Sequence, residues 1–123
     1  MATRITEQLR TNHNRLIGAL AQEYRSRGYH VEADHIGHPN GSPPTISRHV
    51  PDVAAYSNGI LRIIAEAETC DTISSADTQS QWTAFSRSPY RFEVIVPERC
   101  LQDAQQQAIL WGITVDQWWS VNF

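Results

Sequence analysis

The sequence contains no lysine, and all ten of its basic residues are therefore arginine. Long apolar runs are also missing. None approaches the ~20 residues that a transmembrane helix needs, which excludes a membrane-spanning helix. The first residues, MATRITEQLR, are polar and lack the apolar core of a signal peptide. These absences predict a cytoplasmic protein that has no membrane partner.

Cysteine is scarce, and the two cysteines, Cys70 and Cys100, match neither a metal-binding spacing nor a disulfide framework. In the expected cytoplasmic setting, both are predicted to be free thiols. Three histidines, His30, His35 and His38, lie close together in the sequence, but their spacing matches no standard zinc site and no cysteine is nearby. A solvated face of a strand is therefore the favoured interpretation of these histidines.

An excess of positive charge is also missing, because 13 acidic residues against 10 arginines give a net charge of −3. A nucleic-acid-binding protein usually carries a basic surface, so this balance counts against such a function unless the arginines cluster. Arginine suits phosphate well, since its planar guanidinium group binds two oxygens at once. The length of 123 residues and the hydrophobic content of 41% predict one folded domain, residues 1–123, with one modest core.

Apolar periodicity predicts an α/β fold, in the order α-β-β-β-α-β-α-β, with a mixed sheet flanked by helices. The expected helices cover residues 6–27, 76–87 and 98–111. The expected strands outside the central hairpin cover residues 29–36, 90–96 and 115–121. The hairpin itself joins two apolar runs, residues 49–56 and 60–69, around Asn58-Gly59, a pair that readily adopts positive φ.

Acidic residues lie on both strands of this hairpin, with Asp52 on the first and Glu66 and Glu68 on the second. Side chains alternate along a strand, so Glu66 and Glu68 are expected on one face of the sheet. Two carboxylates on an otherwise apolar strand repel each other and are costly to desolvate. A hard divalent cation such as Mg²⁺ would remove this penalty, and Asp52 is in range to be a third ligand.

The sequence Pro51-Asp52, followed by a hairpin and by Glu66-x-Glu68, resembles the PD-(D/E)xK nuclease signature. In this resemblance Asp52 matches the first acid of the family, Glu66 matches the second, and Glu68 stands at the lysine position. That substitution is a departure, although some restriction endonucleases of the superfamily carry glutamate there. The resemblance implies a restriction-endonuclease-like sheet and the neighbourhood of restriction, repair and junction-resolving enzymes.

Two further positions are suggested by the same resemblance. Gln81 and Phe85, four residues apart on an expected helix, resemble the Q-x-x-x-Y element of RecB-like nucleases, with Phe in place of Tyr. Gln81 would then orient water or phosphate, although it also fits a partly exposed helix position. Glu23 falls within the apolar stripe of the first helix and would either face the metal site, as an acid does in many family members, or pair with Arg27.

The resemblance implies a nucleic-acid phosphodiesterase, with DNA as the expected substrate and Mg²⁺ or Mn²⁺ as the cofactor. Asp52 and Glu66 would hold the ion, and Glu68 would accept a proton from water or bind a second ion. Four arginines near these acids in the sequence are expected to contact nucleic acid: Arg48, Arg62, Arg87 and Arg91. Arg62, which alternation places on the face of the acids, would otherwise only neutralise them.

A second class of function remains open, a nuclease-fold binding or assembly module that does not cut. The missing lysine and the net negative charge both favour this alternative. A third possible function, a glycosidase, fits poorly. The two carboxyl groups of a glycosidase flank a bond from opposite sides, whereas Glu66 and Glu68 are expected on one strand face. The chain is too short for a separate target-recognition domain, so selectivity would come from loops, a homodimer or a partner in a larger complex.

Overall fold

The computed structural model describes residues 2–122, and of residues 2–10 only the helical backbone. The fold is α/β, with a five-stranded mixed sheet flanked by helices, as the sequence predicted. A short 3₁₀ helix, η1, precedes the last α-helix. The elements in chain order are α1 (Ala2–Ser26), β1 (His30–Ala33), β2 (Val53–Ser57), β3 (Ile60–Ala67), α2 (Ala76–Ser86), β4 (Arg91–Pro97), η1 (Glu98–Cys100), α3 (Leu101–Leu110) and β5 (Gln117–Val121).

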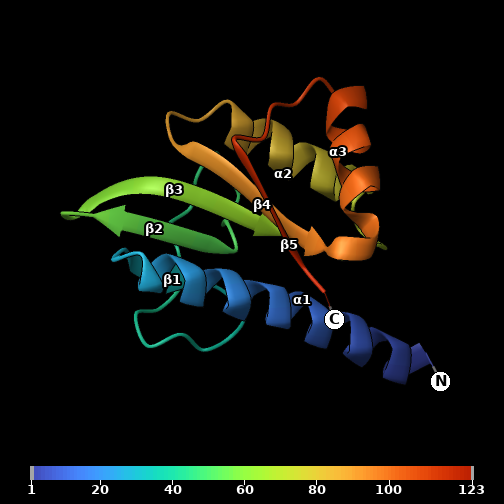
Figure 1. The fold of residues 1–123 in the computed structure, drawn as a ribbon, viewed down its shortest axis with the longest axis horizontal. Helices are drawn as coiled ribbons and strands as arrows, with labels where there is room; N and C mark the ends of the chain where they lie inside the picture. The colour runs from blue at the N-terminus through green and yellow to red at the C-terminus, as the bar shows by residue number, and fades with distance from the viewer. Residues whose placement is uncertain (1, 123) are drawn as a thin grey trace.

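The strands lie in the spatial order β1-β2-β3-β4-β5. β2 is antiparallel to both β1 and β3, whereas β3, β4 and β5 are mutually parallel. Parallel neighbours need a crossover connection, and α2 and α3 provide these crossovers on one face of the sheet (Figure 1). The other face is covered by α1 (Figure 1). The carboxyl ends of β3 and β4 therefore lie side by side.

Two apolar cores lie on the two faces of the sheet. Along β3, Ile63 and Ala65 belong to the core beneath α1, whereas Ile64 belongs to the core beneath α2 and α3. The alternation follows from the period of two in a strand, and it buries β3 on both faces. The acids at the end of β3 are consequently carried by a buried part of the sheet.

The central hairpin forms as predicted around Asn58-Gly59. Both residues have positive φ, 54° and 75°, and Ser57 pairs with Ile60 across a two-residue loop. Positive φ at both loop positions defines the turn that matches the twist of the flanking strands. The resulting register sets Val53 opposite Ala65. The acids that precede β2 and end β3 are thereby brought to the same end of the sheet.

A β-bulge interrupts the hairpin at Arg62. Ala55 pairs with Ile63 and Tyr56 pairs with Leu61, so Arg62 has no partner across the ladder. An extra residue in one strand shifts the alternation of its side chains, and here both Arg62 and Ile63 line a pocket beside α1. The prediction that Arg62 shares the face of Glu66 and Glu68 is therefore wrong, because it assumed unbroken alternation.

Several element boundaries differ from the expected ones. The first helix begins at Ala2, earlier than the predicted residue 6. Strand β1 ends at Ala33 rather than at residue 36, because His35 and Gly37 adopt positive φ, 67° and 63°, and turn the chain. His30 lies on β1 but His35 lies in this turn, so the three histidines do not share one strand face.

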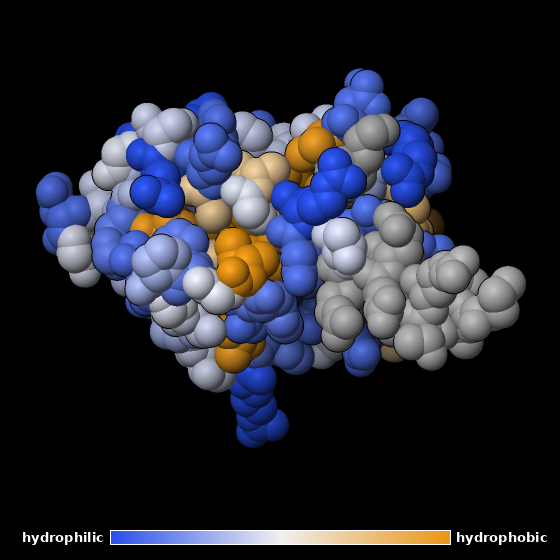
Figure 2. Space-filling view, turned by 90° about the horizontal axis from the view of Figure 1, so that it is seen from below, coloured by the Kyte–Doolittle hydropathy of each residue, from blue (hydrophilic) through white to orange (hydrophobic). Residues whose placement is uncertain are grey.

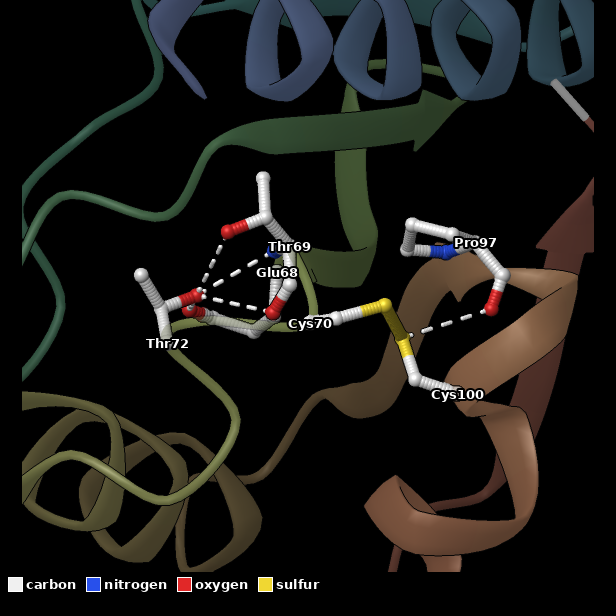
Figure 3. The surroundings of a disulfide bond; sticks show 6 residues. All are labelled: Glu68, Thr69, Cys70, Thr72, Pro97 and Cys100. Carbon is white, nitrogen blue, oxygen red and sulfur yellow. Dashed lines mark hydrogen bonds between the residues drawn. A yellow bond between two sulfur atoms is a disulfide. The ribbon is translucent and has the colours of Figure 1, made fainter. Parts of the chain in front are cut away.

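Cys70 and Cys100 form a disulfide, with their Cα atoms 5.7 Å apart, and the prediction of free thiols is wrong. Cys70 follows β3 and Cys100 ends η1, directly after β4 (Figure 3). Because β3 and β4 are parallel neighbours, the segments that follow them meet. The spacing of the two cysteines in the sequence does not predict that they are close, because their proximity arises from the topology of the sheet.

Loss of this disulfide is expected to lower the free energy of unfolding by about 3 to 4 kcal/mol, since it closes a loop of 30 residues. The corresponding fall in Tm is roughly 10 to 20 °C for a domain of this size. Thermal unfolding of the Cys70→Ser/Cys100→Ser variant, and of the native chain with and without dithiothreitol, measures the effect. Dithiothreitol should leave the double variant unchanged, and an equal Tm for all samples would contradict the expectation.

None of the helices described by the structure is long and apolar enough to cross a membrane. Seen from the side of α1, the coloured part of the surface is mainly hydrophilic, with its apolar residues in small separate areas (Figure 2).

Candidate carboxylate site

Three carboxyl groups meet where β2 begins and β3 ends. Asp52 immediately precedes β2, Glu66 is the penultimate residue of β3, and Glu68 immediately follows β3. All three are buried, with 6%, 2% and 6% of their surfaces exposed. Acids are almost never this buried unless they are paired, so the surrounding groups decide what the cluster can do.

Asp52 and Glu66 are tied to each other through the backbone. The N–H of Asp52 donates to Oε2 of Glu66 at 3.1 Å, and the N–H of Ala67 donates to Oδ2 of Asp52 at 2.9 Å. Two histidines flank Asp52: Nε2 of His13 lies 3.3 Å from Oδ2, and Nε2 of His35 lies 3.7 Å from Oδ1. The carboxyl group of Asp52 is thus the centre of the cluster.

Glu68 is held by two threonine hydroxyls. Thr72 and Thr78 donate to its Oε1 at 2.9 Å and 3.1 Å, and the contact with Thr72 is visible in Figure 3. Thr78 lies in the first turn of α2, where the hydroxyl of Ser75 accepts from its N–H at 3.1 Å and caps the helix. The first turn of α2 therefore contacts Glu68 through the hydroxyl of Thr78.

Asp52 and Glu66 have opposite pKa shifts. Burial would raise the pKa of Asp52, but hydrogen bonds with His13 and Glu66, together with the charge of His13, hold it below its ordinary value. Burial and the charge of Asp52 raise the pKa of Glu66 well above its ordinary value. These opposite shifts favour a proton on Glu66 rather than on Asp52 when the pair carries one.

The pKa values of Glu68 and His13 are both raised. Burial and the charge of Asp52 raise the pKa of Glu68 to about 7, against the opposing hydrogen bonds from Thr72 and Thr78. Burial alone would lower the pKa of His13, but the hydrogen bond to Asp52 and the charges of Asp52 and Glu68 raise it. Carboxyl groups with strongly perturbed pKa values and a specific charge partner are a feature of functional sites.

The donor set suits a hard cation, but it is not arranged around one. Among the side chains that the structure describes, those of residues 11–122, no three from His, Cys, Asp or Glu are positioned to hold a metal ion. One oxygen of each acid is occupied by a protein donor: Oδ2 of Asp52, Oε2 of Glu66 and Oε1 of Glu68. Carboxylate oxygens are the ligands that Mg²⁺ and Mn²⁺ prefer, so the chemistry fits such an ion once the side chains turn and Glu66 loses its proton.

The two accessory positions suggested by the sequence lie apart from each other. Gln81 is half-buried on α2. It lies three residues after Thr78, on the same side of the helix, and Thr78 is one of the two threonines that donate to Glu68. Glu23 lies ten residues after His13 on α1, about 15 Å along the helix axis, and its Oε1 pairs with Nη2 of Arg27 at 3.0 Å. The structure does not bring Glu23 to the carboxylate cluster.

The four arginines expected at nucleic acid do not surround the acids. Arg62 and Arg91 line one pocket at the amino ends of β3 and β4, the opposite end of these strands from Glu66. Arg87 caps the carboxyl end of α2 beside a shallow hollow that also includes His49. Arg48 is exposed in the adjacent turn and has a positive φ of 72°.

Three residues that contact the acids were not predicted from the sequence: His13, Thr72 and Thr78. A usable signal existed for His13, because it lies three and four residues before Leu16 and Ile17 and so on the buried stripe of α1. The threonines carried no such signal, since their positions depend on how the loop after β3 folds back on itself.

No protein-family model, no curated protein and no solved structure matches this chain. Its function is therefore inferred from the chemistry of the cluster.

The metal-free protein is expected to lose stability between pH 5 and pH 8. The pKa of Glu68 rises on folding from its ordinary 4.5 to about 7, so the folded state binds more protons in this range. Its contribution is complete below pH 4.5 and is lost as pH rises through 7, on the order of 3 kcal/mol. His13, whose pKa is also raised, acts in the same direction. Urea unfolding at both pH values, beside Glu68→Gln, measures this dependence, and stability that rises with pH in this range would contradict it.

Proposed function

We propose that this chain is a metal-dependent nucleic-acid phosphodiesterase, with DNA as the expected substrate. The observation that supports this function best is the meeting of three buried carboxyl groups at adjoining strand ends, where burial and the charge of Asp52 raise the pKa of Glu66 well above its ordinary value. Such a cluster costs stability, and a cation would remove the cost. The strand-and-helix sequence α1-β1-β2-β3-α2-β4-α3-β5 is compatible with the restriction-endonuclease-like fold that we propose for this chain.

Asp52 and Glu66 would hold Mg²⁺ or Mn²⁺, which supplies charge neutralisation at the phosphate and activation of water. His13 keeps Asp52 ionised by its hydrogen bond and charge, so this acid is ready to bind a cation at neutral pH. Glu66 must release its proton first. Binding is therefore expected to be weaker at acid pH, because protons and the cation compete for the same oxygens.

Glu68 is the proposed proton acceptor. A general base works best when its pKa is close to the operating pH, and burial together with Asp52 raises the pKa of Glu68 to about 7. The hydroxyls of Thr72 and Thr78 fix one oxygen and leave the other for a water molecule. Gln81, on the adjoining turn of α2, is the proposed group for orienting water or phosphate.

A specific observation also favours the alternative, a nuclease-fold binding or assembly module that does not cut. Every acid of the cluster accepts a hydrogen bond from the protein itself, as a purely structural network would require. In that case neither metal nor catalysis is needed to keep the acids together. A homodimer or a partner chain would then carry the function.

The two possibilities are separated by incubating the protein with double-stranded DNA, single-stranded DNA and RNA in Mn²⁺, in Mg²⁺ and in a chelator. The phosphodiesterase is expected to cut at least one substrate with metal and none without it. Asp52→Ala should slow cleavage by at least about 10³-fold, whereas Asp103→Ala, an exposed acid on α3, should have no effect. No cleavage under any condition would favour the assembly module.

A further inference from the structure

A pocket of about 400 Å³ opens beside α1, at the amino ends of β3 and β4. Its volume is within the range of sites for small molecules. Arg62, in its wall, is four residues before Glu66, which corresponds to about 13 Å along a strand. The pocket is therefore separate from the carboxylate cluster, at the other end of the same strand.

The lining of this pocket is cationic in a protein whose net charge is −3. Three guanidinium groups, those of Arg27, Arg62 and Arg91, face one carboxylate, that of Glu93. A further acid, Glu23, pairs with Arg27 from outside the lining. Arg27 thus has an acidic partner, and Arg91 has two, Glu93 and the nearby Asp116, which leaves Arg62 as the lining arginine without an acidic partner among residues 11–122.

Glu93 is committed to holding the walls of the pocket. It is 3% exposed, and its Oε1 accepts from the hydroxyl of Tyr24 at 2.6 Å and from Nε1 of Trp119 at 2.7 Å. Burial and the charge of Glu93 raise the pKa of Tyr24, so its phenol remains a donor. Oε2 of Glu93 accepts from Nε of Arg91 at 2.6 Å. This carboxylate therefore links α1, β4 and β5.

Arg91 is oriented by that network, because its Nη2 also donates to the carbonyl oxygen of Asp116 at 3.3 Å. Its guanidinium group has five N–H donors, and these two bonds leave others directed elsewhere. Arg27 is likewise fixed, with its guanidinium carbon 4.9 Å from the centre of the Trp119 ring. Two cationic groups are thus positioned before any ligand arrives, which reduces the entropy cost of binding.

Arg62 differs from both, since no hydrogen-bond or ion-pair partner is found for it among the described side chains, those of residues 11–122. The β-bulge turns this side chain toward the pocket instead of into the core beneath α2. Bulges that redirect a side chain are frequent next to functional sites. An exposed arginine without a protein partner, beside other guanidinium groups, is available to bind an anion.

We propose that this pocket binds a phosphate monoester, with the phosphate on Arg62 and Arg91 and the organic group against Tyr29 and Ile63. A monoester carries about −1.5 to −2 charges at pH 7 and offers three oxygens, which match two or more guanidinium groups. The terminal phosphate of a nucleic-acid strand and a free phosphorylated small molecule share this chemistry. The site does not depend on cleavage at the carboxylate cluster.

Calorimetric titration in a metal-free buffer with chelator tests the site without any cleavage. The probes are thymidine 5′-monophosphate, thymidine, and one oligothymidylate with and without a 5′-phosphate. Both phosphorylated probes are expected to bind, and both unphosphorylated probes at least tenfold more weakly. Arg62→Ala should weaken binding of the phosphorylated probes by roughly 10- to 100-fold. Arg99→Ala, which removes the same charge from an exposed position on η1, should leave it unchanged.

The comparison between the phosphorylated probes identifies the source of the phosphate. Tighter binding of the 5′-phosphorylated oligonucleotide supports a strand end, and equal or tighter binding of the mononucleotide supports a free small molecule. Three results would overturn the proposal: no binding of either phosphorylated probe at millimolar concentration, equal binding of the unphosphorylated probes, or equal effects of Arg62→Ala and Arg99→Ala. Because no cleavage is measured, failure of the proposed phosphodiesterase would leave each of these results interpretable.

Discussion

Glu68→Gln is expected to slow metal-dependent cleavage by about 10²- to 10⁴-fold, the usual contribution of a general base. Glutamine keeps the size of the side chain and can still accept from Thr72 and Thr78, so the fold should survive. It cannot accept a proton from water. The wild-type rate should rise with pH up to an apparent pKa of about 7 or below, because a nearby cation favours the ionised form, and the variant should lack this rise.

Glu98→Gln provides a matched control, since it makes the same change at an exposed position on η1 and should leave the rate unaltered. Glu68→Lys is the sharper variant, because lysine is what the resembling nucleases carry at this position. A lysine beside Asp52 stays protonated and cannot be the base, so cleavage should fall as it does with glutamine. Equal or faster cleavage by Glu68→Lys would mean that the position only needs a polar group near the water.

Glu66→Gln is expected to abolish most of the stabilisation by metal while leaving the metal-free protein as stable as before, or more stable. The raised pKa of Glu66 favours its protonated form, and glutamine reproduces that form, including a donor toward Asp52. In the wild type, Mg²⁺ or Mn²⁺ at ten times its Kd should add about 1.4 kcal/mol to the free energy of unfolding. Thermal unfolding with and without each ion, at pH 8, measures both effects.

Glu32→Gln, a change to a half-buried acid on β1, is a control for the loss of one carboxylate and should retain the full metal response. A wild type whose Tm does not respond to either ion, together with a Glu66→Gln variant that is less stable without metal, would mean that the acids are structural.

Local signals in the sequence predicted the central hairpin correctly. Asn58-Gly59 determines a two-residue turn by its backbone preference alone, and that turn fixes the register. Once the register is fixed, Asp52 and Glu66 must come to the same end of the sheet. The α/β class was predictable for a similar reason, since three strands in succession followed by two strand–helix steps give a mixed sheet.

Features that depend on contacts between distant segments were not predictable. The disulfide forms because two parallel strands end side by side, and neither cysteine carries a local sign of its partner. Arg62 was assigned to the wrong face because a bulge leaves no clear mark in the sequence. On α1, the sequence suggests Glu23, a polar residue in the apolar stripe, as a member of the site. The residue of α1 that contacts Asp52 is instead His13, ten residues earlier, and Glu23 pairs with Arg27.

The most direct test of the central claim is calorimetric titration of Mn²⁺ into the metal-free protein at pH 7, repeated in buffers of different ionisation enthalpy. The carboxylate site should bind at least one ion per chain and release protons, because Glu66 and part of the Glu68 population are protonated beforehand. Asp52→Asn should eliminate both the binding and the proton release, while Asp103→Asn should preserve them. Absence of binding at millimolar Mn²⁺, or binding that Asp52→Asn leaves unchanged, would contradict a metal site at Asp52 and Glu66.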